Sequence, residues 1–149
     1  MVSRWATLPR DESFRELDHP ADVFLELRGR DLAELYLNGL FGLYAQVIEL
    51  TGVRLEQIRP VHGSGDDPAG TLRSLLAEAL YLFETERFVA GGAVIDHATE
   101  KSAGASLWGE TFSPEKHERL LEVKAVTYHQ LKAWRTESGE WRATLIFDV

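Results

Sequence analysis

The stretch 31–48, DLAELYLNGLFGLYAQVI, decides much of the fold, because its apolar side chains recur with the period of an α-helix. Asp31 is of a residue type that caps helix starts, and Glu34 stands three positions later, as in a capping box. The apolar positions form one stripe along the helix: Leu32, Leu35, Tyr36, Leu40, Leu43, Val47 and Ile48. The stretch therefore predicts an amphipathic helix that a sheet or another helix must cover.

A second amphipathic helix is predicted after Asp67, because Asp is a good N-cap and Pro68 suits the first helical turn. Its apolar side chains have the same period: Leu72, Leu75, Leu76, Ala79, Leu80 and Phe83.

The rest of the chain is richer in short apolar or alternating runs, which indicate strands. The runs cover 14–17, 23–27, 54–61, 89–95, 106–112, 122–134 and 141–149. The residues that follow 54–61, His62-Gly-Ser-Gly65, are typical of a loop, and the last two runs flank a glycine-containing turn. This order predicts an α+β fold, in which two amphipathic helices pack on one side of a largely antiparallel sheet.

The last run, 141–149, has the clearest alternation, so it predicts a strand with two distinct faces. One face carries Trp141, Ala143, Leu145 and Phe147, and the other carries Arg142, Thr144, Ile146 and Asp148.

Composition limits the class of protein. The 149 residues are 44% hydrophobic and 27% charged, which indicates a single globular domain over 1–149. The chain has no Cys, which excludes disulfides and thiolate metal sites. The net charge of −8 argues against autonomous nucleic-acid binding and favours a basic partner or a cation.

No membrane or export segment is predicted. The first ten residues contain no apolar core of a signal peptide. The longest uncharged stretch, 35–48, has 14 residues, fewer than the roughly 20 that span a bilayer. We therefore expect a cytoplasmic protein without membrane contact.

Two acidic segments are candidates for chemistry. The bend 18–22, Asp-His-Pro-Ala-Asp, is either a polar turn or a cation site, because hard divalent ions prefer carboxylate and carbonyl oxygens. The end of the chain places the Asp148 carboxylate beside the terminal carboxylate of Val149. If the last strand docks beside the bend, these groups and Asp22 converge, and raised pKa values or a bound cation would relieve their repulsion. Spacing alone does not decide between these alternatives.

Other motifs are less informative. His62, His97, His117 and His129 lack the spacing of metal ligands and are expected to be surface or packing residues. Phosphate-binding loops and nucleophile elbows are absent from the sequence. By its local sequence, Lys124 is an outward-pointing lysine on an exposed face.

Several motifs together resemble the archease family. Residues 17–23, LDHPADV, resemble its Asp-His-Thr-Ala-Asp signature with Pro20 in the threonine position, and 123–129, VKAVTYH, are similar to a second signature. Gly109-Glu110 and His117 stand at the family's spacing, and 75–86 resemble its second helix. The ending Phe147-Asp-Val149 is similar to the family's Asp-Ile/Val ending. The resemblance covers essentially the whole chain.

The resemblance implies an archease-like fold and a role that the residues alone do not reveal. Archeases activate the GTP- and manganese-dependent RNA ligase of tRNA splicing, promoting guanylylation of its histidine and repeated turnover, and are not themselves enzymes. The family's metal ligands correspond here to Asp22, Asp148 and the carboxylate of Val149. Lys124 corresponds to a lysine linked to activation, and Asp18 to an acidic position of open role. The expected cofactor is a divalent cation, Ca²⁺, Mg²⁺ or Mn²⁺.

Two other functions fit the residues. A stand-alone hydrolase could use carboxylate-bound metal to activate water, although the sequence offers no positive clamp beyond Lys124. A chaperone or protein-binding module would bind its partner without metal and tolerate loss of Asp148.

Overall fold

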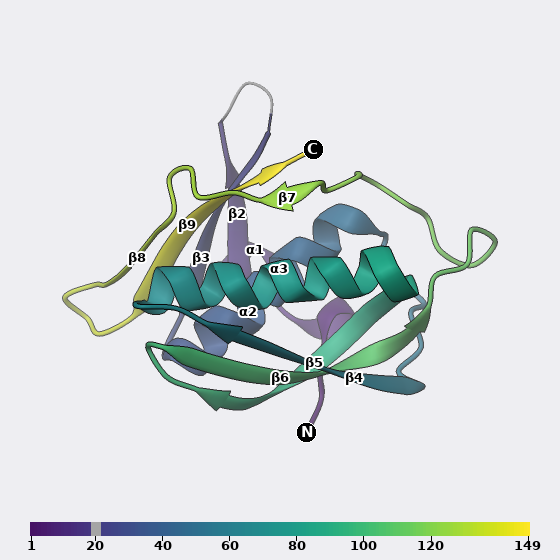
Figure 1. Cartoon of the computed structure of the whole chain (residues 1–149), viewed down its shortest axis with the longest axis horizontal. Coiled ribbons are helices and arrows are strands. Elements are labelled where there is room, and N and C mark those ends of the chain that lie inside the picture. Colours follow the sequence, from purple (N-terminus) through teal and green to yellow (C-terminus); the bar gives the residue numbers. More distant parts are fainter. Residues whose placement is uncertain (19–21) are drawn as a thin grey trace.

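The structure is a computed structural model that describes residues 1–18 and 22–149, and Figure 1 shows its arrangement. The helices are α1 (Arg10–Ser13), α2 (Leu32–Val47) and α3 (Pro68–Glu86), with a 3-10 turn at Trp5–Thr7. The strands are β1 (Ser3–Arg4), β2 (Phe14–Leu17), β3 (Val23–Gly29), β4 (Gln57–Ser64), β5 (Phe88–Ala98), β6 (Ser102–Thr111), β7 (Ala125–Val126), β8 (Lys132–Arg135) and β9 (Trp141–Asp148).

Within the described residues, the strands form two antiparallel sheets, so the fold is α+β as predicted. Sheet I has the order β1-β5-β6-β4, and sheet II has the order β2-β3-β9-β7, with β8 also pairing with β9. Figure 1 shows α3 running between them. Each sheet therefore has helices on one side, but the expected single sheet is divided into two.

The helix α2 differs from the expected amphipathic helix because both sheets cover it. It packs against β3 of sheet II and β5 of sheet I, and nearly every residue from Leu35 to Val47 is buried. An apolar stripe alone would not require this burial; Gly39 and Gly42 permit the close approach of side chains from α3 and β3. The core thus runs through α2 rather than along one side of it.

Both predicted helix caps are confirmed. Asp31 accepts a hydrogen bond from the Glu34 N–H at 2.8 Å, and Asp67 accepts one from the Gly70 N–H at 2.8 Å. The Glu34 carboxylate does not close a capping box with Asp31, because it accepts from the Arg30 N–H and pairs with the Arg30 guanidinium.

The predicted loop at 62–65 is wrong for its first three residues, which belong to β4. Gly63 lies against the backbone of α3, where a Cβ would come within 2.5 Å of the Leu75 nitrogen. This glycine therefore serves a close approach between strand and helix, and the sequence pattern did not distinguish that role from a turn.

The predicted strand 122–134 is divided into β7 and β8. Between them, Thr127 binds back to β9 through its N–H and its hydroxyl, both of which donate to the Ile146 carbonyl. Gln130 has a φ of 54°, a left-handed conformation that interrupts a strand. The predicted glycine turn is confirmed, because Gly139 has a φ of 87° and its N–H donates to the Thr136 carbonyl.

On the first of the two faces predicted for β9, Ala143, Leu145 and Phe147 are fully covered. The other face is not simply exposed, because Thr144 and Ile146 are also buried. Thr144 donates to the Gln130 carbonyl at 2.7 Å, so the segment after β7 binds to this side of the strand. Among the described residues, no helix is long and apolar enough to cross a membrane.

Candidate functional site

The end of β9 is where the sequence-predicted site residues meet. β9 lies between β3 and β7, and the pairs Val23–Phe147 and Ala125–Asp148 are the outermost on its two sides. Just beyond them, the Lys124 N–H donates to the Asp148 carbonyl at 2.7 Å. Segments near residues 22, 124 and 148 are therefore joined by one end of one sheet.

The register places Asp22 next to Asp148, because Val23 pairs with Phe147 in an antiparallel ladder. Residues opposite one another on antiparallel strands have their side chains on the same face. Asp148 is exposed, and Asp22 and Val149 are half-buried. We call Asp22, Asp148 and Val149 the acidic end.

Lys124 is exposed and immediately precedes β7. The strand is fixed from the side of α3, because the Arg73 guanidinium donates to the Val126 carbonyl at 3.0 Å and lies 3.9 Å from the centre of the Tyr128 ring. The Lys124 side chain therefore extends from a backbone segment that contacts with β9 and α3 hold in place. The outward orientation expected for Lys124 agrees with its exposure.

A hollow of about 320 Å³ adjoins the acidic end, lined by Asp22, His129, Gln130 and Ile146. His129 is the residue here that sequence analysis did not assign to the site. Its signal was weak, because within 123–129 it stands one position beyond the residues that match the second signature. The hollow brings an imidazole to the same surface as the Asp22 carboxylate.

Asp18 follows β2 directly and is exposed, one position past the Leu17–Phe24 pair. His19, Pro20 and Ala21 lie outside the described residues, so the choice between a polar turn and a cation site at 18–22 stays a prediction.

In chemical terms the acidic end offers carboxylate oxygens, which are the donors that hard divalent cations prefer. The part of the chain that the structure describes contains no group of three His, Asp or Glu side chains placed to hold a metal ion. The third donor of the expected set is a main-chain carboxylate, that of Val149.

A second acidic group, around Glu110, is buried and satisfied. The Glu110 carboxylate accepts hydrogen bonds from the Arg54 N–H at 2.9 Å, the Lys116 ammonium at 2.6 Å and His117 Nε2 at 2.9 Å. His117 Nδ1 accepts from the Ser113 N–H, which leaves Nε2 to carry the proton. Burial raises the pKa of Glu110, but these donors outweigh it and lower that pKa to about 2.

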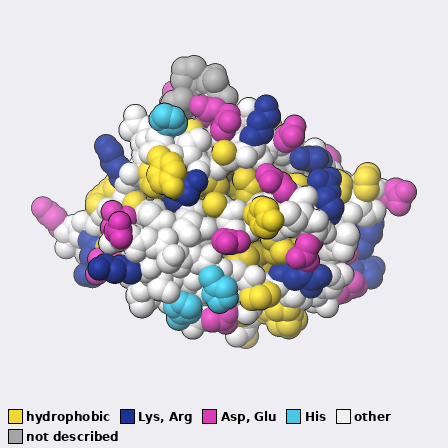
Figure 2. Space-filling model, viewed as in Figure 1, with side chains coloured by type: hydrophobic (Ala, Val, Ile, Leu, Met, Phe, Trp, Pro, Cys, Tyr) yellow, Lys and Arg dark blue, Asp and Glu magenta, His cyan; other side chains and the backbone are white. Residues whose placement is uncertain are grey.

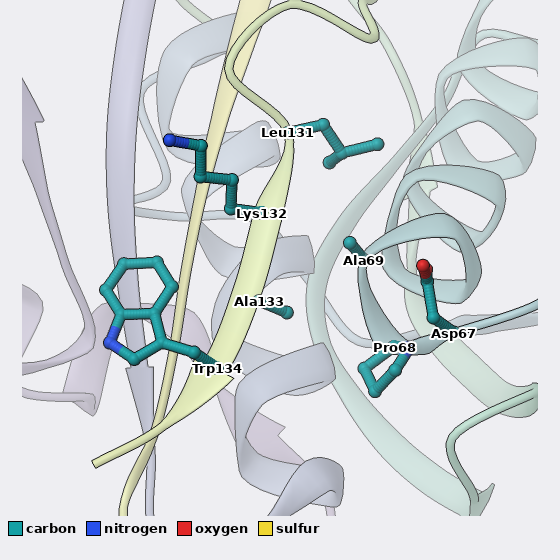
Figure 3. A pocket seen from close by; sticks show the side chains of 7 residues that line it. All are labelled: Asp67, Pro68, Ala69, Leu131, Lys132, Ala133 and Trp134. Atoms are coloured by element: carbon teal, nitrogen blue, oxygen red, sulfur yellow. The ribbon is translucent and has the colours of Figure 1, made fainter.

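A further hollow, of about 490 Å³, lies between the start of α3 and β8. Figure 3 shows Leu131 and Ala133 pointing toward α3, whereas Lys132 and Trp134 point away from it. The Asp67 carboxylate in this hollow already caps α3. None of the residues singled out as a metal or activation site lines it.

The comparisons with known proteins point in one direction. The sequence model of the Archease protein family matches residues 14–149. Protein archease of Pyrococcus abyssi is 31% identical over 135 residues, covering 89% of this chain and 95% of that protein. Protein archease of Archaeoglobus fulgidus is 32% identical over 138 residues, covering 91% of this chain and 98% of that protein.

Solved structures give the same result for the fold. A solution structure of a Methanobacterium thermoautotrophicum protein has a TM-score of 0.78 at 27% identity, covering 93% of this chain and 99% of that one. A crystal structure from Thermotoga maritima, described as an archease and possible chaperone, has a TM-score of 0.61 at 16% identity, covering 91% and 96%. At 16% identity, the second likeness concerns the fold alone.

Proposed function

This chain belongs to the archease family, and from that premise we propose that it is an accessory protein that activates a GTP- and manganese-dependent RNA ligase. It would promote guanylylation of the ligase's histidine, so that the ligase turns over repeatedly, and would catalyse no reaction itself. The Thermotoga maritima relative is described as a possible chaperone, which is compatible with an accessory role.

The observation that carries the proposal is the juxtaposition at the end of β9. The pairing of Val23 with Phe147 supports a site that contains both Asp22 and Asp148. Like charges on neighbouring strands repel each other, and a cation bound between them would replace this repulsion with attraction. We therefore propose that Asp22, Asp148 and the Val149 carboxylate bind Ca²⁺, Mg²⁺ or Mn²⁺, whose positive charge would be presented to the partner.

Lys124 is proposed to contact a phosphate of the nucleotide on the ligase. Its exposure and its fixed backbone support this role, because a mobile ammonium on a held strand can reach a docked ligand. Asp18, exposed at the end of β2, is proposed to face the same partner.

The proposed partner is the RNA ligase of tRNA splicing or RNA repair, met in the cytoplasm. An enzyme that binds RNA must have a positive channel, and the net charge of −8 on this chain complements it. The protein is not expected to bind RNA autonomously or to contact a membrane.

The test is RNA ligation with substrate in excess over ligase, in the presence of GTP and Mn²⁺, with this protein added or withheld. We expect a change from about one product per ligase to many, and a parallel rise in guanylylated ligase. Asp148→Asn should abolish both effects. Asp66→Asn, which removes an exposed carboxylate just before α3, is the matched control and should activate fully.

A parallel pair of variants tests the lysine. Lys124→Ala should lower activation strongly, whereas Lys132→Ala, which removes another exposed lysine on a strand paired with β9, should not.

Other outcomes would favour other functions. Full activation by Asp148→Asn, with partner binding unchanged by chelation of metal, would contradict the acidic site and support a metal-independent chaperone. Release of phosphate from generic phosphate esters by this protein with Mn²⁺ alone would instead support a hydrolase. No stimulation by a folded wild-type protein would contradict the ligase proposal itself.

A further inference from the structure

Two histidines lie on neighbouring positions of the outer face of sheet I, whereas the acidic end belongs to sheet II. His62 on β4 and His97 on β5 both pair with the same residue, Gly104 on the intervening strand β6. Both side chains are exposed, and Figure 2 shows two histidine side chains next to each other on the surface below α3. The strand order therefore brings together imidazoles that are distant in sequence.

A β-bulge gives His97 this position. The register of β5 against β6 shifts between Ile95 and His97, so that Asp96 is the extra residue. Without the shift, Asp96 would stand opposite Gly104 and His97 would stand opposite the buried Ala103, because side chains alternate between faces. The bulge turns the His97 imidazole to the outer face, the kind of redirection for which bulges are used.

Because Gly104 has no side chain, the His97 ring lies over its backbone. A Cβ at Gly104 would lie 2.7 Å from His97 Nδ1 and 3.4 Å from His62 Nδ1. The Nδ1 atoms of both rings thus face the space above a residue that has no side chain. Gly104 itself is buried although it lies on an outer face, because the rings cover it.

The orientation of His97 is held from its other nitrogen. His97 Nε2 shares a hydrogen bond of 2.9 Å with the Ser102 hydroxyl. When Nε2 carries the proton and donates it to Ser102, Nδ1 is left with a lone pair on the side of the ring that lies over Gly104. Metal-bound histidines are commonly held in this way by a partner on the second nitrogen.

A carboxylate completes the polar surroundings. Asp96 precedes His97 in the bulge, and its carboxylate accepts a hydrogen bond from Ser106 at 2.8 Å. Ser102, Gly104 and Ser106 alternate along β6 and share its outer face. The negative charge of Asp96 would favour a cation bound beside it.

We propose that His62 and His97 form a two-imidazole site for a borderline-soft divalent metal ion, of which Zn²⁺ is the probe of choice. Imidazole nitrogen suits Zn²⁺, Cu²⁺ and Ni²⁺, whereas oxygen-only donors suit Ca²⁺, Mg²⁺ and Mn²⁺. Water would fill the remaining ligand positions. The site lies on sheet I and the acidic end lies on sheet II, so this inference is independent of the proposed function.

The experiment is a Zn²⁺ titration of the whole protein, monitored through the imidazole resonances of its histidines by NMR. We expect the His62 and His97 resonances to change together, with one equivalent of Zn²⁺, and both Nδ1 atoms to shift as ligands. His62→Gln or His97→Gln should weaken binding by more than about tenfold. His129→Gln, which changes an exposed histidine in the turn between β7 and β8, is the matched control and should not.

A further variant keeps both ligands. Gly104→Ala would put a methyl group where the His97 ring now lies, and because that ring is the end of a flexible side chain the fold should survive, as far-UV circular dichroism can verify. We expect weaker Zn²⁺ binding in this variant and unchanged binding in Asp148→Asn. Binding that persists in His62→Gln and His97→Gln, or that disappears only in Asp148→Asn, would overturn the proposal.

Discussion

Glu110 on β6 and Asp148 on β9 are both carboxylates near the end of a strand, but their surroundings differ. Glu110 is buried and receives donors from Arg54, Lys116 and His117. Asp148 is exposed, and its described neighbour across the strand is another carboxylate, that of Asp22. The Glu110 carboxylate holds parts of the chain together, whereas the Asp148 carboxylate lies at the surface. The comparison teaches that an acidic residue of this protein contributes to its stability when it is buried among hydrogen-bond donors, and much less when it is exposed.

The most severe test of this contrast is Glu110→Ala. Removing a buried acceptor leaves His117 and the Arg54 N–H without their partner, which costs about 3 kcal/mol in the free energy of unfolding. Urea denaturation measures this loss. Asp148→Ala, with an exposed side chain, should change the same quantity by less than about 0.5 kcal/mol. Equal losses in the two variants would remove the distinction.

A double-mutant cycle tests the hydrogen bond between the buried residues Glu110 and His117. Glu110→Gln and His117→Gln should each destabilise, and the double variant should lose less than the sum, with a coupling of about 1 to 2 kcal/mol. The same cycle on Asp148 and Lys124, which meet through the backbone, should give a coupling near zero. Additive losses in the free energy of unfolding at Glu110 and His117 would show that the hydrogen bond between them does not contribute to stability.

The dependence of stability on pH is a smaller effect of the same carboxylate. Hydrogen bonds lower the pKa of Glu110 to about 2 in the folded protein, below its ordinary value of 4.5. Its contribution to stability is therefore complete above about pH 4.5 and is lost as the pH falls toward 2. Denaturation midpoints of the wild type and Glu110→Gln, measured between pH 6 and 2.5, should converge as the pH falls. A constant difference would contradict the assignment.

The smallest expected change is at the acidic end and has the opposite sign. Asp148→Asn removes a negative charge from the position next to the Val23–Phe147 pair, on the same strand end as Asp22, which should raise the free energy of unfolding by about 0.5 kcal/mol at low salt without divalent metal. High salt should abolish this gain because it screens exposed charges. The control Asp66→Asn should show no comparable gain. A loss of stability in Asp148→Asn would mean that this carboxylate supports the fold, as Glu110 does.

Sequence reasoning predicted most of the elements that depend on local pattern. The caps Asp31 and Asp67 and the strand at the end of the chain follow from residue type and period, and the structure confirms them. The break between β7 and β8 was missed, since it depends on Thr127 binding the Ile146 carbonyl across the sheet. The division into two sheets was missed for the same reason, because apolar patterns do not tell how many surfaces cover a helix.

For the candidate site, the family resemblance selected residues that local spacing could not join. The pairing of β3 with β9 then brings the segments of Asp22 and Asp148 together, and this pairing is a feature of the tertiary structure. The Glu110–His117 contact and the bulge at Asp96 were not predictable either, since the first depends on the turn that Ser113 forms with His117 and the second on the register of β5. His62 and His97 had no ligand spacing in sequence and are neighbours only across three strands.

The place of β9 inside sheet II has a consequence for how the protein is made. Because β9 lies between β3 and β7, this sheet closes only after nearly all of the chain described here has left the ribosome. Until then, the β2–β3 hairpin has an unpaired edge, and such long-range pairing forms slowly. Asp22 and Asp148 meet only through that final closure. A nascent or misfolded chain would therefore lack the juxtaposition of these two residues, which makes the acidic end a property of the completed fold.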